Sequence, residues 1–222
     1  MVGNVLMAVG AMIAAYLIGS ISFAVIFSKL FTGKDVRESG SGNAGATNML
    51  RTAGKIPGIL TFVCDALKGF AACLVGRVVF EYLYTATAQN ELFSPVYGAY
   101  LCCIAVMLGH IFPVFFGFKG GKAVACNVGT FAVCCPIAII LGLCGFVASL
   151  VISKIVSLSS LIATVIVVGT SVIYQFVGKD ITYNIVPVIV LTLIAGFIVF
   201  IKHKDNIIRL AKGEEQNIFS KK

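Results

Sequence analysis

The chain has 222 residues, of which 59% are hydrophobic and only 12% are charged. Soluble domains usually carry about 25% charged residues, so this composition excludes an ordinary soluble protein and indicates an integral membrane protein. The formal net charge is +8, but a chain this apolar offers no soluble basic face to a nucleic acid. The positive charge instead predicts membrane topology and attraction for anionic ligands and lipid headgroups.

Apolar segments long enough to cross a bilayer recur along the sequence. They predict an all-α integral membrane protein, a seven-transmembrane-helix bundle that forms one domain over residues 1–222, without a cleaved signal sequence. The expected spans are Val5–Leu30, Ile56–Phe80, Pro95–Phe116, Ala123–Cys135, Pro136–Ser153, Val156–Val177 and Asn184–Ile201. The fourth has only about 13 residues, against about 20 for a straight crossing, so we expect a short or thinly spanning helix there.

Charged and sulfur-containing residues also lie within these apolar segments. Asp65 and Lys68 can face each other on a helix at this spacing, which lowers the cost of roughly 2.5–3.5 kcal/mol that each would otherwise face near the bilayer centre. We therefore expect both to point into the bundle. His110 is predicted to be a packing residue, with a direct role as the alternative. The eight cysteines form no Cys-x-x-Cys pair, so we expect apolar packing, without a zinc site or a disulfide framework.

The distribution of lysine and arginine predicts the orientation of the bundle. With the N-terminus outside and the C-terminus cytoplasmic, all but three of the 17 basic residues fall on the cytoplasmic side. The three exceptions are Lys68, Arg77 and Lys179. This orientation brings three polar segments, which are distant in sequence, to one face of the membrane, so a shared site becomes possible.

The first polar segment is Gly40-Ser41-Gly42-Asn43-Ala44-Gly45-Ala46-Thr47-Asn48, and Arg51 follows it. Glycines let backbone N–H groups approach an oxyanion, Ser41 and Thr47 add hydroxyl groups, and Arg51 adds a planar cationic guanidinium. This combination favours a pocket for phosphate. The alternative is a flexible loop between two membrane helices.

The second polar segment, 117–122, lies immediately before an expected helix. Lys119 and Lys122 flank Gly120-Gly121, so backbone donors, a helix N-terminus and two ammonium groups converge where an anion is favoured. The spacing does not match a Walker A loop, which needs four residues between its glycines and a Ser or Thr after the lysine. The alternative is a pair of interfacial lysines that only mark a cytoplasmic loop.

The third polar segment is the tail. His203 and Asn206 fall on one side of a helix, where they can hold a hydroxyl and a phosphate oxygen, and the alternative is an interfacial amphipathic helix. Glu215 is either a structural anchor or a solvent-facing residue. The sequence has no Gly-x-Ser-x-Gly elbow, no His-Glu-x-x-His helix and no His with an Asp five positions later. An enzyme built from these segments would therefore position anions rather than form a covalent acyl-enzyme.

The segments Ser39-Gly40-Ser41-Gly42-Asn43 through Arg51, Gly109-His110 through Lys122, and His203 through Glu215 together resemble the acyl-phosphate:glycerol-3-phosphate acyltransferase family (PlsY type). The resemblance implies a multi-pass enzyme of the bacterial inner membrane, surrounded by membrane lipids, that uses no metal or cofactor. It would transfer a fatty acyl group from acyl phosphate to the 1-hydroxyl of glycerol 3-phosphate, giving lysophosphatidic acid and inorganic phosphate. The implied catalytic residues are Ser41, Arg51, Lys122, His203 and Asn206, the substrate-binding residues are Gly42, Asn43, Thr47, Asn48, Lys119, Gly120 and Gly121, and the structural residues are Asp65, Lys68 and Glu215.

Three residues depart from the family pattern. Ser22 replaces a common proline, Ala123 replaces a glycine that usually follows Lys122, and Cys126 replaces a common threonine. We expect Ala123 to disfavour a positive φ and so to tighten the second segment or alter its grip on phosphate. Two other function classes stay open: a transporter of phosphorylated solutes, which would show internal repeats and polar groups at mid-depth, and a scaffold, which would need no phosphate pocket.

Overall fold

The structure is a computed structural model that describes residues 1–178 and 183–218, and these residues form helices and loops without a strand. The all-α prediction is therefore confirmed. Six helical segments are long and apolar enough to cross a membrane, namely Val2–Thr32, Lys55–Ala86, Pro95–Phe116, Pro136–Ser153, Val156–Val177 and Ile185–Lys202. The expected short span is the 11-residue helix α6 (Val124–Cys134). The total of seven spans and the orientation stay predictions, and Lys179, Lys221 and Lys222, which entered the charge argument, lie outside the described residues.

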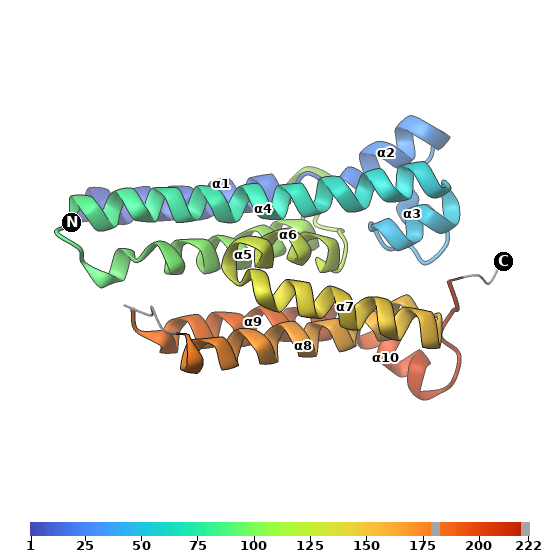
Figure 1. Ribbon diagram of the computed structural model, residues 1–222. Coiled ribbons are helices and arrows are strands. Elements are labelled where there is room, and N and C mark those ends of the chain that lie inside the picture. The colour runs from blue at the N-terminus through green and yellow to red at the C-terminus, as the bar shows by residue number, and fades with distance from the viewer. Residues whose placement is uncertain (179–182, 219–222) are drawn as a thin grey trace. The chain divides into compact units, whose positions relative to one another are not determined.

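The chain divides into two compact units, Met1–Cys134 (unit 1) and Cys135–Lys222 (unit 2), and the prediction of a single domain stays a prediction. Unit 1 contains six α-helices and three short 3-10 helices (Figure 1). They are α1 (Val2–Gly19), α2 (Phe23–Thr32), η1 (Val36–Glu38), α3 (Ala46–Thr52), α4 (Lys55–Ala86), η2 (Glu91–Phe93), α5 (Pro95–Ile111), η3 (Val114–Phe116) and α6. At 1.5 Å per residue the 32-residue α4 is about 48 Å long, and α1, α5 and α6 pack along it.

Close helix contacts in unit 1 depend on glycine. A Cβ atom on Gly109 of α5 would lie 2.1 Å from the carbonyl oxygen of Tyr16 in α1, and a Cβ on Gly76 of α4 would lie 2.3 Å from the carbonyl oxygen of Gly98 in α5. Any larger residue would force these helices apart. Small residues at contact points are how membrane helices approach closely without a hydrophobic driving force.

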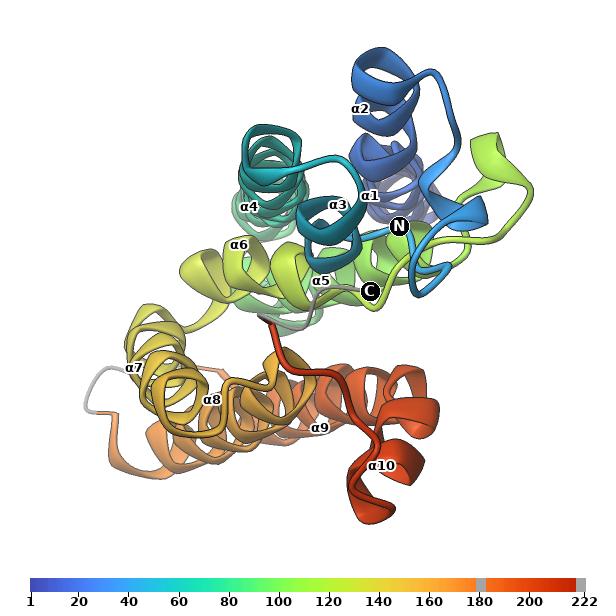
Figure 2. The same ribbon diagram turned by 90° about the vertical axis from the view of Figure 1, so that its right-hand side faces the viewer.

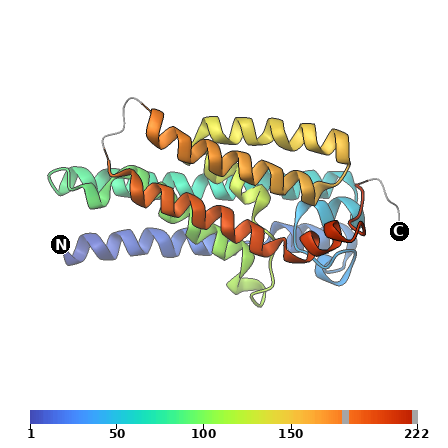
Figure 3. The ribbon, with the colours of Figure 1, turned by 90° about the horizontal axis from the view of Figure 1, so that it is seen from below.

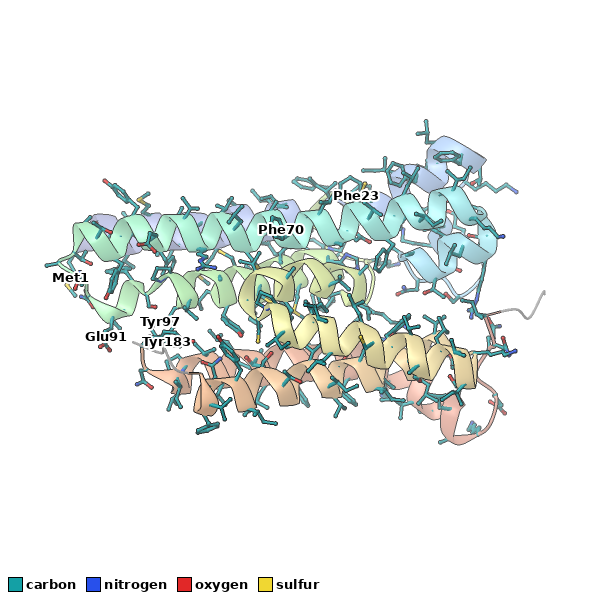
Figure 4. The ribbon with its side chains drawn as sticks, viewed as in Figure 1. Met1, Phe23, Phe70, Glu91, Tyr97 and Tyr183 are labelled. Carbon is teal, nitrogen blue, oxygen red and sulfur yellow. The ribbon has the colours of Figure 1, made fainter. Side chains whose placement is uncertain are left out.

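The first expected span is interrupted, because α1 ends at Gly19 and α2 begins at Phe23. Helix α5 also ends well before the chain re-enters a helix at α6. The first polar segment follows α2 and η1, and the second lies between α5 and α6. Met1, Glu91 and Tyr97 lie at one end of unit 1 and α3 lies at the other, so the first polar segment is remote from the N-terminus (Figures 1 and 4).

Unit 2 contains α7 (Pro136–Ser153), α8 (Val156–Val177), α9 (Ile185–Lys202) and α10 (Lys204–Ala211). Helix α8 packs against both α7 and α9, and it lies between them when seen from below (Figure 3). Helix α10 follows α9 directly and turns away from its axis at His203 (Figure 2). The tail then returns to the α7–α8 turn, where the N–H of Ile218 donates to the carbonyl oxygen of Lys154 at 2.8 Å.

Candidate active site

The side chain of Asn48 organises the first polar segment. It is 1% exposed, and its Nδ2 atom lies 3.0–3.1 Å from the carbonyl oxygens of Val36, Ser39 and Asn43. Its Oδ1 atom accepts the N–H of Ser41 at 3.0 Å. Asn48 therefore ties the loop to the first turn of α3, and its amide is occupied by the protein's own backbone.

Glycine is required around the Asn48 amide. Gly40 has a φ of +60°, and a Cβ atom there would lie 2.3 Å from Asn48 Oδ1. Gly42 has a φ of +70°, which is also in the region that glycine adopts at little cost. Between them Ser41 is exposed, so its hydroxyl lies at the surface of the loop while its N–H is used internally.

Arg37 lies in η1, just before the first polar segment, and it holds the backbone at the second polar segment. Its Nη1 atom donates to the carbonyl oxygens of Phe116 at 2.6 Å and Lys119 at 3.1 Å. The other side of the guanidinium pairs with Asp35, through Nη2–Oδ2 at 2.8 Å and Nε–Oδ1 at 3.0 Å. The side-chain hydrogen bond between the two lowers the pKa of Asp35 and raises the pKa of Arg37. Sequence reasoning missed Arg37, although the Asp35-x-Arg37 spacing within a polar segment was an available signal.

The second polar segment differs from the expected phosphate loop in its backbone. The N–H groups of Gly120 and Gly121 donate to the carbonyl oxygens of Ile111 and His110, each at 3.1 Å. The expectation that these two amides are available to an anion is therefore wrong, because they complete the C-terminal end of α5. The two glycines serve close packing instead. A Cβ on Gly121 would lie 2.3 Å from His110 Nε2 and 2.5 Å from the carbonyl oxygen of Ala44, in the first polar segment.

The residues that follow this loop lead into α6. Lys119 is exposed and Lys122 is half-buried. Ala123 is fully buried with a φ of +62°. Alanine disfavours a positive φ, as expected, but the chain adopts that conformation here. A left-handed conformation costs a non-glycine residue about 1–2 kcal/mol, and the surrounding packing enforces it.

Asp65, Lys68 and His110 form a buried polar network behind the loops. Lys68 Nζ lies 2.8 Å from Asp65 Oδ1, so the predicted pairing is confirmed. The same ammonium donates to the carbonyl oxygen of Ile21 at 2.7 Å, which the interruption between α1 and α2 leaves without a helical partner. It also lies 5.7 Å from the centre of the Phe23 ring. His110 Nδ1 is 3.6 Å from Asp65 Oδ1, so this network holds the histidine against which Gly121 packs.

Unit 2 carries the residues of the third polar segment. His203 is 3% exposed and precedes α10. Its Nδ1 atom lies 2.8 Å from the carbonyl oxygen of Val199. A carbonyl oxygen can only accept, so Nδ1 carries the proton and Nε2 is the basic nitrogen of the neutral ring.

Glu215 anchors the tail of unit 2. It accepts from Asn206 Nδ2 at 2.7 Å, from Arg209 Nε at 2.7 Å and from Ser157 Oγ at 2.9 Å. Burial alone would raise the pKa of Glu215, but these three donors outweigh it and lower the pKa below its usual value. Of the two readings left open for Glu215, these contacts favour the structural anchor. They also fix the side chain of Asn206, which is 6% exposed.

The predicted site residues thus fall into two groups. Unit 1 brings Ser41, Thr47, Arg51, Lys119 and Lys122 onto two connected segments that rest on the buried network. Thr47 and Arg51 are half-buried and lie in the first and last turns of α3. Unit 2 groups His203, Asn206 and Glu215. Unit 1 therefore holds most of the predicted cationic site residues, and unit 2 holds the histidine and the asparagine.

A family model described as glycerol-3-phosphate acyltransferase matches residues 9–213. The chain belongs to the glycerol-3-phosphate acyltransferase family. It is 38% identical over 207 residues to glycerol-3-phosphate acyltransferase 2 of Bacillus anthracis, covering 93% of this chain and 97% of that protein. It is 37% identical over 209 residues to the Enterococcus faecalis glycerol-3-phosphate acyltransferase, covering 93% and 90%.

Solved structures give the same result. The crystal structure of PlsY in its glycerol 3-phosphate form, described as an integral membrane glycerol 3-phosphate acyltransferase, matches with a TM-score of 0.76 and 33% identity, covering 95% of this chain and 94% of that one. The lysophosphatidic acid form of PlsY matches with a TM-score of 0.73. The chain is therefore a membrane acyltransferase of the PlsY type.

Proposed function

We propose that this acyltransferase moves a fatty acyl group from acyl phosphate to the 1-hydroxyl of glycerol 3-phosphate. The products are lysophosphatidic acid and inorganic phosphate. The observation that carries the proposal is the close approach of two segments rich in glycine and cationic residues. Gly121 of the second segment packs against Ala44 of the first, and Arg37 of η1 holds the backbone at the second segment. The glycerol 3-phosphate and lysophosphatidic acid forms in which PlsY was solved support the acceptor and the product.

The donor phosphate is assigned to unit 1. Ser41 is placed to offer an exposed hydroxyl, and Arg51, Lys119 and Lys122 offer positive charge. The first-turn N–H groups of α6 supply further donors, since a helix leaves these groups without intrahelical partners. Together they neutralise charge on the departing phosphate. Removing one well-placed donor of this kind costs about 2.7–4 kcal/mol where charge develops in the transition state.

The other residues of unit 1 have supporting roles. Gly42, Asn43 and Thr47 shape the surface beside Ser41. Asn48 holds that surface in place, because its side-chain amide is hydrogen-bonded to the loop backbone at Ser41 and Ser39. Gly120 and Gly121 allow the second segment to approach α5 and the first segment, so their contribution is close packing rather than N–H donation.

The acceptor is assigned to His203 and Asn206 of unit 2. The Nδ1–H bond to Val199 leaves Nε2 as the basic nitrogen, which suits it to receive the proton of the attacking hydroxyl. The hydroxyl oxygen attacks the acyl carbonyl carbon, the bond from that carbon to the phosphate oxygen breaks, and phosphate leaves with its electron pair. No acyl-enzyme is formed, so positioning and charge neutralisation provide the rate enhancement.

For the membrane, we propose seven spans, of which α6 is the short fourth, with an external N-terminus and a cytoplasmic C-terminus. The lysine and arginine distribution supports this orientation. The bacterial relatives support the inner, or plasma, membrane of a bacterium as the location.

The test uses purified protein in detergent with glycerol 3-phosphate and each of three donors: acyl phosphate, acyl-coenzyme A and acyl carrier protein. We expect lysophosphatidic acid and equimolar phosphate with acyl phosphate only. Ser41→Ala and Arg51→Ala should each lower turnover about 100-fold or more, while Lys55→Ala, which removes an exposed charge at the start of α4, should not. Normal turnover by well-folded Ser41→Ala and Arg51→Ala variants would reject the residue assignment, and transfer from acyl-coenzyme A alone would reject the donor.

A further inference from the structure

Three cysteines from three different helices of unit 1 meet at one point. The sulfur atoms of Cys73 in α4, Cys103 in α5 and Cys134 in α6 all lie within 4.8 Å of one another. The residues are about 30 positions apart along the chain, so no short sequence motif predicts the cluster. Neither the acyl transfer nor the buried polar network uses these thiols.

A fourth sulfur extends the cluster. Cys103 Sγ lies 3.9 Å from Met107 Sδ, one turn further along α5. Cys73, Cys103 and Met107 are fully buried, whereas Cys134, the last residue of α6, is half-buried. The group is therefore a sulfur-lined position in the interior of unit 1, with Cys134 as its most exposed member.

The helices that carry these thiols are fixed at close range on both sides of Cys73. Gly69 and Gly76 lie about one turn before and after it. A Cβ on Gly69 would lie 2.2 Å from the carbonyl oxygen of Cys126 in α6, and a Cβ on Gly76 would lie 2.3 Å from the carbonyl oxygen of Gly98 in α5. Because close packing holds α4, α5 and α6 in this way, the three sulfurs are preorganised rather than brought together by chance rotamers.

We propose that Cys73, Cys103 and Cys134 form a binding site for a soft monovalent cation, with copper(I) as the ion class and the Met107 sulfur as an additional weak donor. Thiolate and thioether ligands select copper(I) over hard cations. Metal–sulfur bonds of about 2.3 Å in a trigonal arrangement place the sulfurs about 4 Å apart, so the cluster needs to contract by less than about 1 Å.

Charge balance decides between the soft ions. Binding proceeds by loss of one thiol proton to solvent, formation of one thiolate–copper bond and formation of two dative bonds from the lone pairs of the other two thiols. A monovalent ion with a single thiolate therefore leaves the site neutral. A neutral product matters because an uncompensated charge is costly inside an apolar bundle. Zinc is less well suited, since it is divalent and takes four ligands that seldom include a thioether.

The test is a titration of the reduced, detergent-purified full chain with copper(I) in the presence of a competing chromophoric copper(I) chelator. We expect one tightly held equivalent, an ultraviolet thiolate-to-copper band, and a thermal midpoint that rises with copper(I) because binding stabilises the folded state. Cys103→Ser, and separately Cys134→Ser at the half-buried position, should weaken binding about 100-fold and remove the midpoint shift. Because the two substitutions are tested in separate proteins, a folding defect in one variant leaves the other as a valid test.

Matched controls come from cysteines outside the cluster. Cys102→Ser changes the buried neighbour of Cys103, and Cys144→Ser changes an exposed thiol, and both should keep the tight equivalent. The proposal is overturned if the wild-type chain yields its copper(I) to the chelator as readily as free glutathione does. It is equally overturned if Cys134→Ser binds as the wild type does, or if Cys102→Ser loses binding to the same extent as Cys103→Ser.

Discussion

The guanidinium of Arg37 donates to the carbonyl oxygen of Phe116 at 2.6 Å, across 79 positions of sequence. The same nitrogen reaches the carbonyl oxygen of Lys119 at 3.1 Å. Asp35 holds the other edge of the guanidinium. One side chain thus fixes the backbone at the second polar segment against the η1 turn that precedes the first polar segment.

We predict that Arg37→Ala lowers kcat/KM about 10- to 100-fold, because hydrogen bonds made by a charged group are worth about 1.5–3 kcal/mol each and only part of that loss reaches the transition state. The KM for acyl phosphate should rise more than the KM for glycerol 3-phosphate. Arg37→Lys should recover little, since an ammonium lacks the planar fork that bonds to Asp35 and Phe116 together. Steady-state kinetics with each substrate varied in turn checks this.

Lys34→Ala is the matched control, because it removes one exposed positive charge from the loop that precedes Arg37. Its kinetics should stay close to those of the wild type. If both variants lose the same activity, net charge rather than the Arg37 clamp explains the effect. If neither loses activity, the clamp has no role in positioning the donor segments.

The buried pair gives a second prediction. Asp65→Asn leaves the Lys68 ammonium, only 5% exposed, beside a neutral amide, which should destabilise unit 1 by about 3–5 kcal/mol. The double variant Asp65→Leu/Lys68→Met removes both charges and should recover most of that stability. Thermal unfolding in detergent measures both. A double variant no more stable than Asp65→Asn would show that the pair is needed as an ion pair.

The features of the fold and of the site that could be predicted from the sequence are those set by residues close together along the chain. Asp65 and Lys68 were paired correctly because an i, i+3 spacing fixes their relative position on a helix. The short α6 was expected from the length of its apolar segment. The interruption between α1 and α2 was not predicted. The three residues at Ser20–Ser22 are too few to divide the long apolar segment in which they lie.

Long-range contacts to backbone atoms could not be predicted. The acceptors of Arg37 are carbonyl oxygens, which every residue carries, so the sequence does not mark them. The N–H groups of Gly120 and Gly121 were expected to face an anion, but the end of α5 needs them to satisfy its own carbonyl groups. The cysteine cluster likewise depends on the packing of three helices and not on any spacing.

Ala123 gives a third prediction. Ala123→Gly relieves about 1–2 kcal/mol of left-handed strain and loses a buried methyl group worth about 0.8 kcal/mol. The net effect should be a small gain in stability, of roughly 0.5 kcal/mol, with unchanged activity. Ala125→Gly, two positions later inside α6, should instead lose about 0.5–1 kcal/mol. If both variants lose stability equally, the positive φ at Ala123 carries no strain.

Glu215 gives a fourth prediction, which concerns how the stability of the fold depends on pH. The folded protein lowers the pKa of Glu215 below its ordinary value of 4.5, so folding favours the anionic form. The stabilisation is fully present above about pH 4.5 and is lost as the pH falls through the lower folded-state pKa. Glu215→Gln should therefore be less stable than the wild type at pH 7, because an amide cannot replace the carboxylate that accepts from Asn206, Arg209 and Ser157.

The difference in thermal midpoint between wild type and Glu215→Gln, measured from pH 7 down to pH 3, should shrink toward zero at the acidic end, since the wild-type carboxyl group is then also neutral. Glu214→Gln is the control, because Glu214 is exposed and its substitution should give no pH-dependent difference. A difference that stays constant between pH 7 and pH 3 would mean that Glu215 anchors the tail through its shape and not through its charge. In the predicted case, acid should release the tail that fixes Asn206, so kcat/KM for glycerol 3-phosphate should fall over the same pH range in the wild type.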